Sequence, residues 1–305
     1  PLCQDLGIRF PILSVGMGGG MAGPELTAAV SNAGGCGVLG MGGLPAPYIQ
    51  QQIQQLRTLT DKPFGVNIIL PLLQEGQIET CLDEDVPVLV LFWGDPAPYV
   101  KEAHRKGTKV FVQVGSVEEA VTAAEAGVDA IIAQGIEAGG HVKSTTSLST
   151  IVPAVIEAVG PLPVIASGGI ANGRGVVAAL GLGAQAVSMG TRFVASEEIL
   201  VTQEYKQRIV DGKAEDTHSG EGPGQLGYVH REKRRHIVID RCLFGEILAL
   251  GDDEPLHDVV NRDAVRVQEV AVADPGVLVN VNTPEDHAQA LETLRGNGAT
   301  PKAEG

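Results

Sequence analysis

Residues 163–192, PVIASGGIANGRGVVAALGLGAQAVSMGTR, decide the expected fold, because they hold two apolar runs with a helical segment between them. The runs PVIAS (163–167) and AVSM (186–189) are short and end in small residues, which is typical of buried β-strands. The segment GRGVVAALGLG (173–183) has helical spacing of its apolar residues and glycines near its end. A strand, a helix and a second strand predict parallel strands joined by a right-handed crossover.

The same alternation extends back toward the start of the chain. Eight apolar runs read as strands: FPILSV (10–15), CGVLG (36–40), FGVNIIL (64–70), VPVLVLF (86–92), KVFVQVG (109–115), DAIIAQG (129–135), PVIASGG (163–169) and AVSMGTR (186–192). Eight parallel strands are the number that closes a (β/α)8 TIM barrel. An open doubly wound sheet is the alternative, but GMGGGMAG (16–23) lacks the last glycine of a dinucleotide-binding loop.

The pattern changes after residue 200. Residues 205–236 are polar and rich in glycine, and strand-like and helix-like pieces of another kind follow them. We therefore expect a barrel over residues 1–217, a linker over 218–227 and a C-terminal α/β appendage over 228–305.

Composition and charge narrow the class of protein. The net charge of −15 argues against nucleic acid, whose phosphates demand clustered Lys and Arg. The four cysteines lack the paired spacing of a zinc site or a disulfide framework, which indicates a reduced, cytoplasmic protein without a metal site. No apolar run approaches the roughly 18 residues that cross a membrane. We expect a cytoplasmic protein that binds neither nucleic acid nor membrane, and we leave a homo-oligomer open.

Small residues follow the seventh and eighth apolar runs. Gly168 and Gly169 follow the apolar residues of the seventh run, and Gly190 and Thr191 follow those of the eighth. In a (β/α)8 barrel these two turns are neighbours at the C-terminal mouth and recur as a phosphate site. Their backbone N–H groups are suited to cradle an anion together. The alternative is that the glycines serve only as tight turns.

Glycines and amides mark four other strand ends. They are Gly16, Met17 and Gly18 after the first run, and Asn67, Gln113 and Gln134 after the third, fifth and sixth. Such groups can hydrogen-bond the edge of an isoalloxazine ring, and glycine turns let the flat ring lie close. Each amide alone is equally well explained as a structural group, but three of them in one barrel favour a flavin.

Four stretches carry a resemblance to a known family. AAVSNAGGCGVLG (28–40), PFGVN (63–67), AQGIEAGGHV (133–142) and residues 163–198 together resemble the nitronate monooxygenases, formerly called 2-nitropropane dioxygenases. FMN-dependent enoyl-acyl-carrier-protein reductases share these motifs, and the resemblance runs from about residue 5 to 217. It implies a TIM barrel with non-covalent FMN. The positions carried over for the cofactor are Asn67, Gln134, Gly139, Ser167, Gly169, Ser188, Met189, Gly190 and Thr191.

The resemblance places the family's active-site histidine at His141. Gly139 and Gly140 precede it and would let the loop pass close to the flavin, so that the imidazole stands beside the ring. A histidine there is suited to transfer a proton or to hold an anion.

The resemblance also implies a reaction, in which dioxygen oxidises an alkyl nitronate to a carbonyl compound and nitrite. The partners would be a small-molecule substrate and dioxygen. The alternative on the same motifs is NAD(P)H-dependent reduction of enoyl thioesters or quinones. A third hypothesis is a barrel that binds a phosphorylated metabolite without catalysis.

The end of the chain has a resemblance of its own. Residues 243–292 resemble the C-terminal end of molybdenum-cofactor nucleotidyltransferases, but Asn280 and Asn282 replace the family's acidic pair. That family's glycine-rich nucleotide loop has no counterpart here, so we interpret the segment as a packing or interaction appendage.

Overall fold

The computed structural model describes residues 2–212, 217–221 and 229–233. Its main sheet has eight parallel strands in the order β1-β9-β8-β6-β5-β4-β3-β2. An isolated parallel bridge between Leu13 and Cys36 joins β1 to β2, so the sheet returns on itself as a barrel. The strands are β1 (Ile12–Ser14), β2 (Gly37–Gly40), β3 (Phe64–Ile69), β4 (Val88–Phe92), β5 (Lys109–Val114), β6 (Ala130–Gln134), β8 (Val164–Ser167) and β9 (Ala186–Met189). This topology confirms the predicted (β/α)8 barrel.

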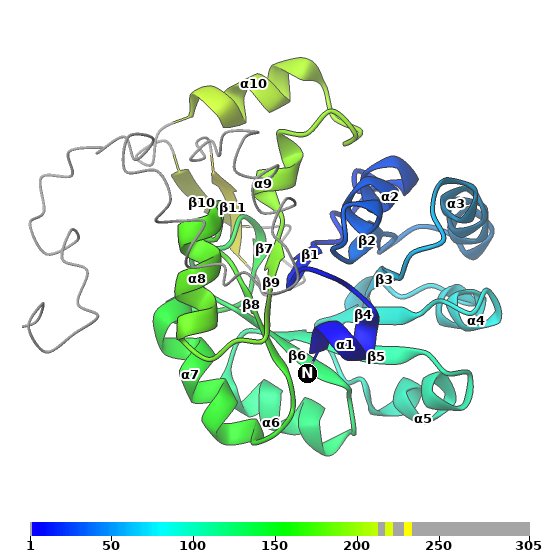
Figure 1. The fold of residues 1–305 in the computed structure, drawn as a ribbon, viewed down its shortest axis with the longest axis horizontal. Coiled ribbons are helices and arrows are strands. Elements are labelled where there is room, and N and C mark those ends of the chain that lie inside the picture. The colour runs from blue at the N-terminus through cyan, green and yellow to red at the C-terminus, as the bar shows by residue number, and fades with distance from the viewer. Residues whose placement is uncertain (1, 213–216, 222–228, 234–305) are drawn as a thin grey trace, which may run out of the picture. The chain divides into compact units, whose positions relative to one another are not determined.

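Helices surround the barrel strands, as Figure 1 shows. Those between consecutive barrel strands are α2 (Pro24–Asn32), α3 (Ala46–Leu59), α4 (Gln77–Asp83), α5 (Ala97–Arg105), α6 (Val117–Glu125), α7 (Leu148–Val159) and α8 (Gly173–Gly181). The others are α1 (Leu2–Leu6), the 3-10 turn η1 (Leu70–Leu72), α9 (Thr191–Val194) and α10 (Gln203–Asp211). Ser116 and Asn172 begin α6 and α8 by accepting hydrogen bonds from the backbone N–H groups of Glu119 and Gly175.

Two apolar clusters bury both faces of the strands. One fills the barrel interior with Val90, Phe111 and Ile132, and Leu2 and Leu6 of α1 belong to it. The other lies between strands and helices and contains, among others, Val66, Leu89, Leu91, Val112, Ile131 and Val187. Because each strand is buried on both faces, its sequence is a mainly apolar run, and this explains why all eight strands could be located from the sequence.

A small antiparallel sheet holds the loop after β6. It consists of β10 (Thr217–Glu221), β11 (Val229–Lys233) and β7 (Gly140–Val142), in the order β10-β11-β7. β11 pairs with β7 so that His230 lies opposite His141 in the register. The sequence did not indicate β7, because a three-residue strand carries no periodic signal.

The expected domain boundary stays a prediction. Residues 218–221 continue β10, while residues 222–228 and 234–305 lie outside the described residues. The chain divides into two units, residues 1–260 and 261–305, and the second unit lies wholly among the residues that are not described. The stretch that we interpreted as polar and glycine-rich contains a helix, α10, which buries Lys206 and Ile209. Within the described ranges, no helix is long and apolar enough to cross a bilayer.

Candidate active site

The interior of the barrel changes from apolar to polar toward the C-terminal ends of its strands. Phe111, Ile132 and Ile165 belong to the interior cluster, and alternate residues of a strand point to the same face. The interior positions two residues further along are therefore polar. Together with Asn67, which pairs with interior Val90, they form a polar layer: Asn67, Gln113, Gln134, Ser167 and Ser188.

Several hydrogen-bonding groups of the polar layer are left for a ligand. Its five side chains are buried, with exposed fractions between 3% and 8%. Asn67 donates to the carbonyl of Val90 at 3.1 Å, but its Oδ1 accepts no hydrogen bond from the described residues. The amide of Gln113 and the hydroxyls of Ser167 and Ser188 likewise have no hydrogen-bond partner within the described ranges. Because buried polar groups are normally paired, this layer fits a ligand that carries both donors and acceptors, as an isoalloxazine edge does.

Three loops meet beside the polar layer at the expected phosphate site. Gly168 and Gly169 have φ angles of +107° and +69°, and a Cβ on Gly168 would lie 3.0 Å from the backbone N of Ala138. A Cβ on Gly139 would lie 2.6 Å from Oγ1 of Thr191. Loop 135–140 therefore contacts both the turn at 168–169 and the turn at 190–191. We call these three segments the glycine cradle.

Gly190 differs from its neighbours in the glycine cradle. A Cβ at this position would meet only Val15, at an ordinary distance of 3.6 Å. No described side chain or backbone thus explains a glycine here, whereas close approach of a ligand would. The structure brings Gly190, Thr191, Gly139 and Gly169 together, as the sequence predicted, but their contact with a phosphate stays a prediction.

The residues after β1 have mixed roles. A Cβ on Gly16 would clash with Cβ of Asn67, so Gly16 lets this loop lie against the polar layer. Gly18 has no atom of the described residues within 4 Å of its Cβ position, which leaves space on that side among them. The side chain of Met189 is buried in the outer core and that of Met17 packs, partly buried, against this core, so contact of Met17 and Met189 with the flavin stays a prediction.

Gln134 holds the strand that carries His141. Its Nε2 donates to the carbonyl of His141 at 2.9 Å, and its Oε1 accepts from the backbone N of Lys143 at 3.1 Å. The amide therefore acts on β7, and direct contact of Gln134 with the flavin stays a prediction. Glu137 fixes the other side of the loop, because its carboxylate accepts from the backbone N of Leu148 at the start of α7.

Trp93 lies against the expected active-site histidine. The rings of Trp93 and His141 are 5.8 Å apart between centroids and stand at 87° to each other. The sequence prediction missed Trp93 because it considered only hydrogen-bonding groups and glycines at strand ends. The position of Trp93 directly after β4 was the signal that should have identified it.

Arg192 is a second residue that the sequence prediction left out. It follows Thr191 of the glycine cradle directly, and burial lowers the pKa of its guanidinium.

The buried cysteines carry no chemistry of their own. Burial raises the pKa of both Cys36 and Cys81 to about 12, so these thiols stay protonated and unreactive. In the described part of the chain, no group of three or more His, Cys, Asp or Glu side chains is placed to hold a metal ion.

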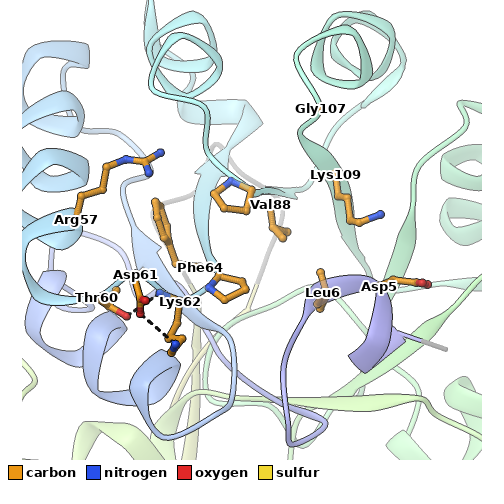
Figure 2. Close-up of a pocket in the computed structure, with 12 residues that line it drawn as sticks. Asp5, Leu6, Arg57, Thr60, Asp61, Lys62, Phe64, Val88, Gly107 and Lys109 are labelled. Carbon is orange, nitrogen blue, oxygen red and sulfur yellow. Dashed lines mark hydrogen bonds and ion pairs between the residues drawn. The ribbon is translucent and has the colours of Figure 1, made fainter.

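A cavity of about 330 Å³ opens at the opposite end of the barrel (Figure 2). Phe64, Val88 and Lys109, which begin β3, β4 and β5, line it. The guanidinium carbon of Arg57 lies over the ring of Phe64, 5.4 Å from its centroid. In this fold, ligands meet the C-terminal ends of the strands, whereas the N-terminal face serves stability. We therefore assign the functional site to the polar layer and not to this cavity.

Comparisons with known proteins agree with this assignment. A family model described as nitronate monooxygenase matches residues 1–79 and 73–222. Probable nitronate monooxygenases from Staphylococcus aureus strains MSSA476 and JH9 are each 33% identical over 262 residues, which covers 71% of this chain and 73% of theirs.

Two solved structures are similar over the same share of the chain. FabK from Thermotoga maritima is 43% identical with a TM-score of 0.71, and the match covers 76% of this chain and 74% of that one. Nitroalkane oxidase from Streptomyces ansochromogenes is 31% identical with a TM-score of 0.69, with coverage of 76% and 79%. The protein is accordingly a flavin-dependent oxidoreductase with FMN as its cofactor, and the chain belongs to the nitronate monooxygenase family.

Proposed function

We propose that the protein oxidises alkyl nitronates with dioxygen to a carbonyl compound and nitrite. The observation that carries the proposal is the position of His141, which Gln134 and the glycine cradle hold at the end of the barrel that carries the polar layer. The family match and the likeness to a nitroalkane oxidase support it.

The chain's own residues would perform the binding steps. When bound, FMN supplies one- and two-electron redox chemistry at its isoalloxazine ring. In this proposal Gln113, Ser167 and Ser188 would hydrogen-bond the edge of that ring, and the glycine cradle would take the phosphate. The side chains of the polar layer are buried, so they would exclude water from the part of the ring that they contact.

His141 would act on the substrate. A nitronate is an anion that has already lost its proton, so a protonated imidazole would bind one of its oxygens by a charge-assisted hydrogen bond. A neutral nitroalkane first needs a base at its α-carbon, and the neutral imidazole would accept that proton.

The reaction is tested by nitrite release from several nitronates in air, without NAD(P)H. The sequence alternative, reduction of enoyl thioesters or quinones with NAD(P)H, is measured on the same preparation, because the FabK match is the more similar in sequence of the two structures. Nitrite release without NAD(P)H supports the proposal. Consumption of NAD(P)H with an enoyl thioester and no nitrite from any nitronate would establish the alternative.

His141→Ala should keep FMN bound and slow both nitro substrates. Turnover of the neutral nitroalkane should fall more, by about 100-fold or more, because proton transfer by a positioned side chain contributes that much. In the unmodified protein, nitroalkane turnover should rise with pH as the imidazole loses its proton, and nitronate turnover should fall over the same range. His104→Gln is the control, since His104 is exposed and bonds to Asp129 at 2.9 Å. Unchanged kinetics in His141→Ala would exclude this role.

A further inference from the structure

Trp93 occupies an unusual place at the mouth of the barrel. It is the chain's single tryptophan, it follows the last residue of β4, and its exposed fraction is only 5%. Together with Ile69 and Phe92 it forms a small apolar cluster that is separate from the two main cores. The ring therefore does not simply extend the packing of the barrel.

The backbone at Trp93 is in the left-handed region. Its φ is +57°, a backbone conformation that residues other than glycine rarely adopt. Gly94 follows with φ of +89°, and a Cβ there would lie 3.0 Å from Cβ of Leu70. Two successive left-handed residues turn the chain sharply at the end of β4. Strained backbone of this kind persists where the surroundings enforce it, and it is concentrated at functional sites.

After this turn, the indole ring of Trp93 contacts two other aromatic rings. Trp93 stacks on Phe92, with ring centroids 4.1 Å apart and planes at 36°. It meets the ring of His141 edge to face at 5.8 Å and 87°. His141 belongs to β7, which is separated from β4 by α5, β5, α6 and β6 along the chain. The indole thus joins two distant segments at the active-site mouth.

Two contacts within the described residues act on His141 beyond the pairing of its strand with β11. The amide of Gln134 holds its backbone carbonyl at 2.9 Å, while Trp93 lies against its ring. An edge-to-face contact depends on the angle between the rings, so it restricts the rotation of the imidazole more than an aliphatic side chain would.

We infer that Trp93 is a positioning residue, which fixes the orientation of the His141 imidazole toward the substrate. The inference rests on the proposed function for its kinetic consequence, but not for the ring contact itself. Trp93→Leu should retain FMN and lower kcat for nitronates by about 2- to 12-fold, the factor that an aromatic pair of this kind is worth. KM should change little, because a misdirected imidazole mainly loses interactions in the transition state. Trp93→Phe keeps an aromatic face and should restore most of kcat.

A double-mutant cycle tests whether Trp93 acts through His141. In a His141→Gln background, Trp93→Leu should cause no further loss of turnover, because the group that it positions is gone. An equal loss in both backgrounds would overturn the inference and give Trp93 an independent role.

A second readout does not need turnover. In protein with ¹³C-labelled histidine, the His141 ring signals should be displaced by the ring current of the indole and should move in Trp93→Leu, whereas the exposed His104 signal should not. Unmoved His141 signals would overturn the inference. If the signals move but neither Trp93→Leu nor His141→Gln changes nitrite release, the contact is established and the proposed function fails.

Discussion

At Gly190 an added Cβ would meet only Val15 among the described residues, 3.6 Å away, whereas at Gly169 it would meet Glu137 and also strain a backbone with φ of +69°. Substitutions at these two glycines of the glycine cradle therefore have different effects. A side chain at Gly169 perturbs the protein and the ligand site together, but a side chain at Gly190 perturbs chiefly a ligand.

Gly190→Val should accordingly lose FMN while the fold persists. The branched side chain would occupy the space in which the backbone approaches the phosphate, and we expect the affinity for FMN to fall by about 100-fold, the weight of two lost charge-assisted hydrogen bonds at roughly 1.5 kcal/mol each. The ratio of flavin to protein absorbance measures the loss, and circular dichroism checks the fold. Gly181→Val is the matched control, since its Cβ would have no described atom within 4 Å other than its chain neighbours and the backbone of its own helix. Full flavin occupancy in Gly190→Val would remove the cradle from the site.

At the level of single residues, the sequence analysis selected polar side chains at strand ends and missed an aromatic side chain that acts through packing. Gln113 and Ser167 could be selected because a polar side chain in an apolar run is conspicuous, and their contact with the flavin stays a prediction. Trp93 was missed because its side chain resembles a continuation of the strand, although its position directly after β4 was a signal. Gln134 was expected at the flavin, but only coordinates could reveal that its amide bonds to β7.

Among the elements, burial on two faces decided what could be predicted. The eight barrel strands are buried on both faces and are therefore mainly apolar, apart from the polar layer near their C-terminal ends. The helix α4 has only seven residues, so its apolar positions do not complete a recognisable period. The strand β7 forms only because β11, some ninety residues later, pairs with it, and single-sequence periodicity carries no information about such a partner.

The pairing of β7 with β11 leads to a prediction about this element. His230→Pro in the full chain should weaken the pair, because proline lacks an N–H and its ring disfavours pairing. Hydrogen exchange of the amides at 140–142 should accelerate by about 10-fold or more, the effect of losing roughly 1.4 kcal/mol of local stability. Mass spectrometry of peptides measures this, with the β5 peptide (Lys109–Val114) as the internal control. FMN should stay bound, because the polar layer is untouched. Unchanged protection of 140–142 would show that Gln134 alone holds β7.

At the scale of the whole molecule, the match to the nitronate monooxygenase family covers the barrel but does not extend to the end of the chain. The family model ends at residue 222, and all eight barrel strands are complete at Met189. The polar layer and the glycine cradle lie entirely before that model's end. The net charge and the scattered cysteines predict a cytoplasmic protein, which stays a prediction, as do the homo-oligomer and the likeness of residues 243–292 to a nucleotidyltransferase.

A chain that ends at Val260 should therefore fold and bind FMN as the full chain does. It keeps the first of the two units into which the chain divides, with the barrel, β7, β10 and β11. Domains that have their own core fold alone, so the flavin-to-protein ratio should be unchanged and the thermal midpoint should shift by no more than about 2 °C, which corresponds to less than 1 kcal/mol for a domain of this size. Insolubility or loss of flavin would show that residues 261–305 complete the barrel's core.

The full chain should release no pyrophosphate from nucleoside triphosphates, because it has no glycine-rich nucleotide loop to hold them. Measured transfer would instead give the appendage an activity of its own.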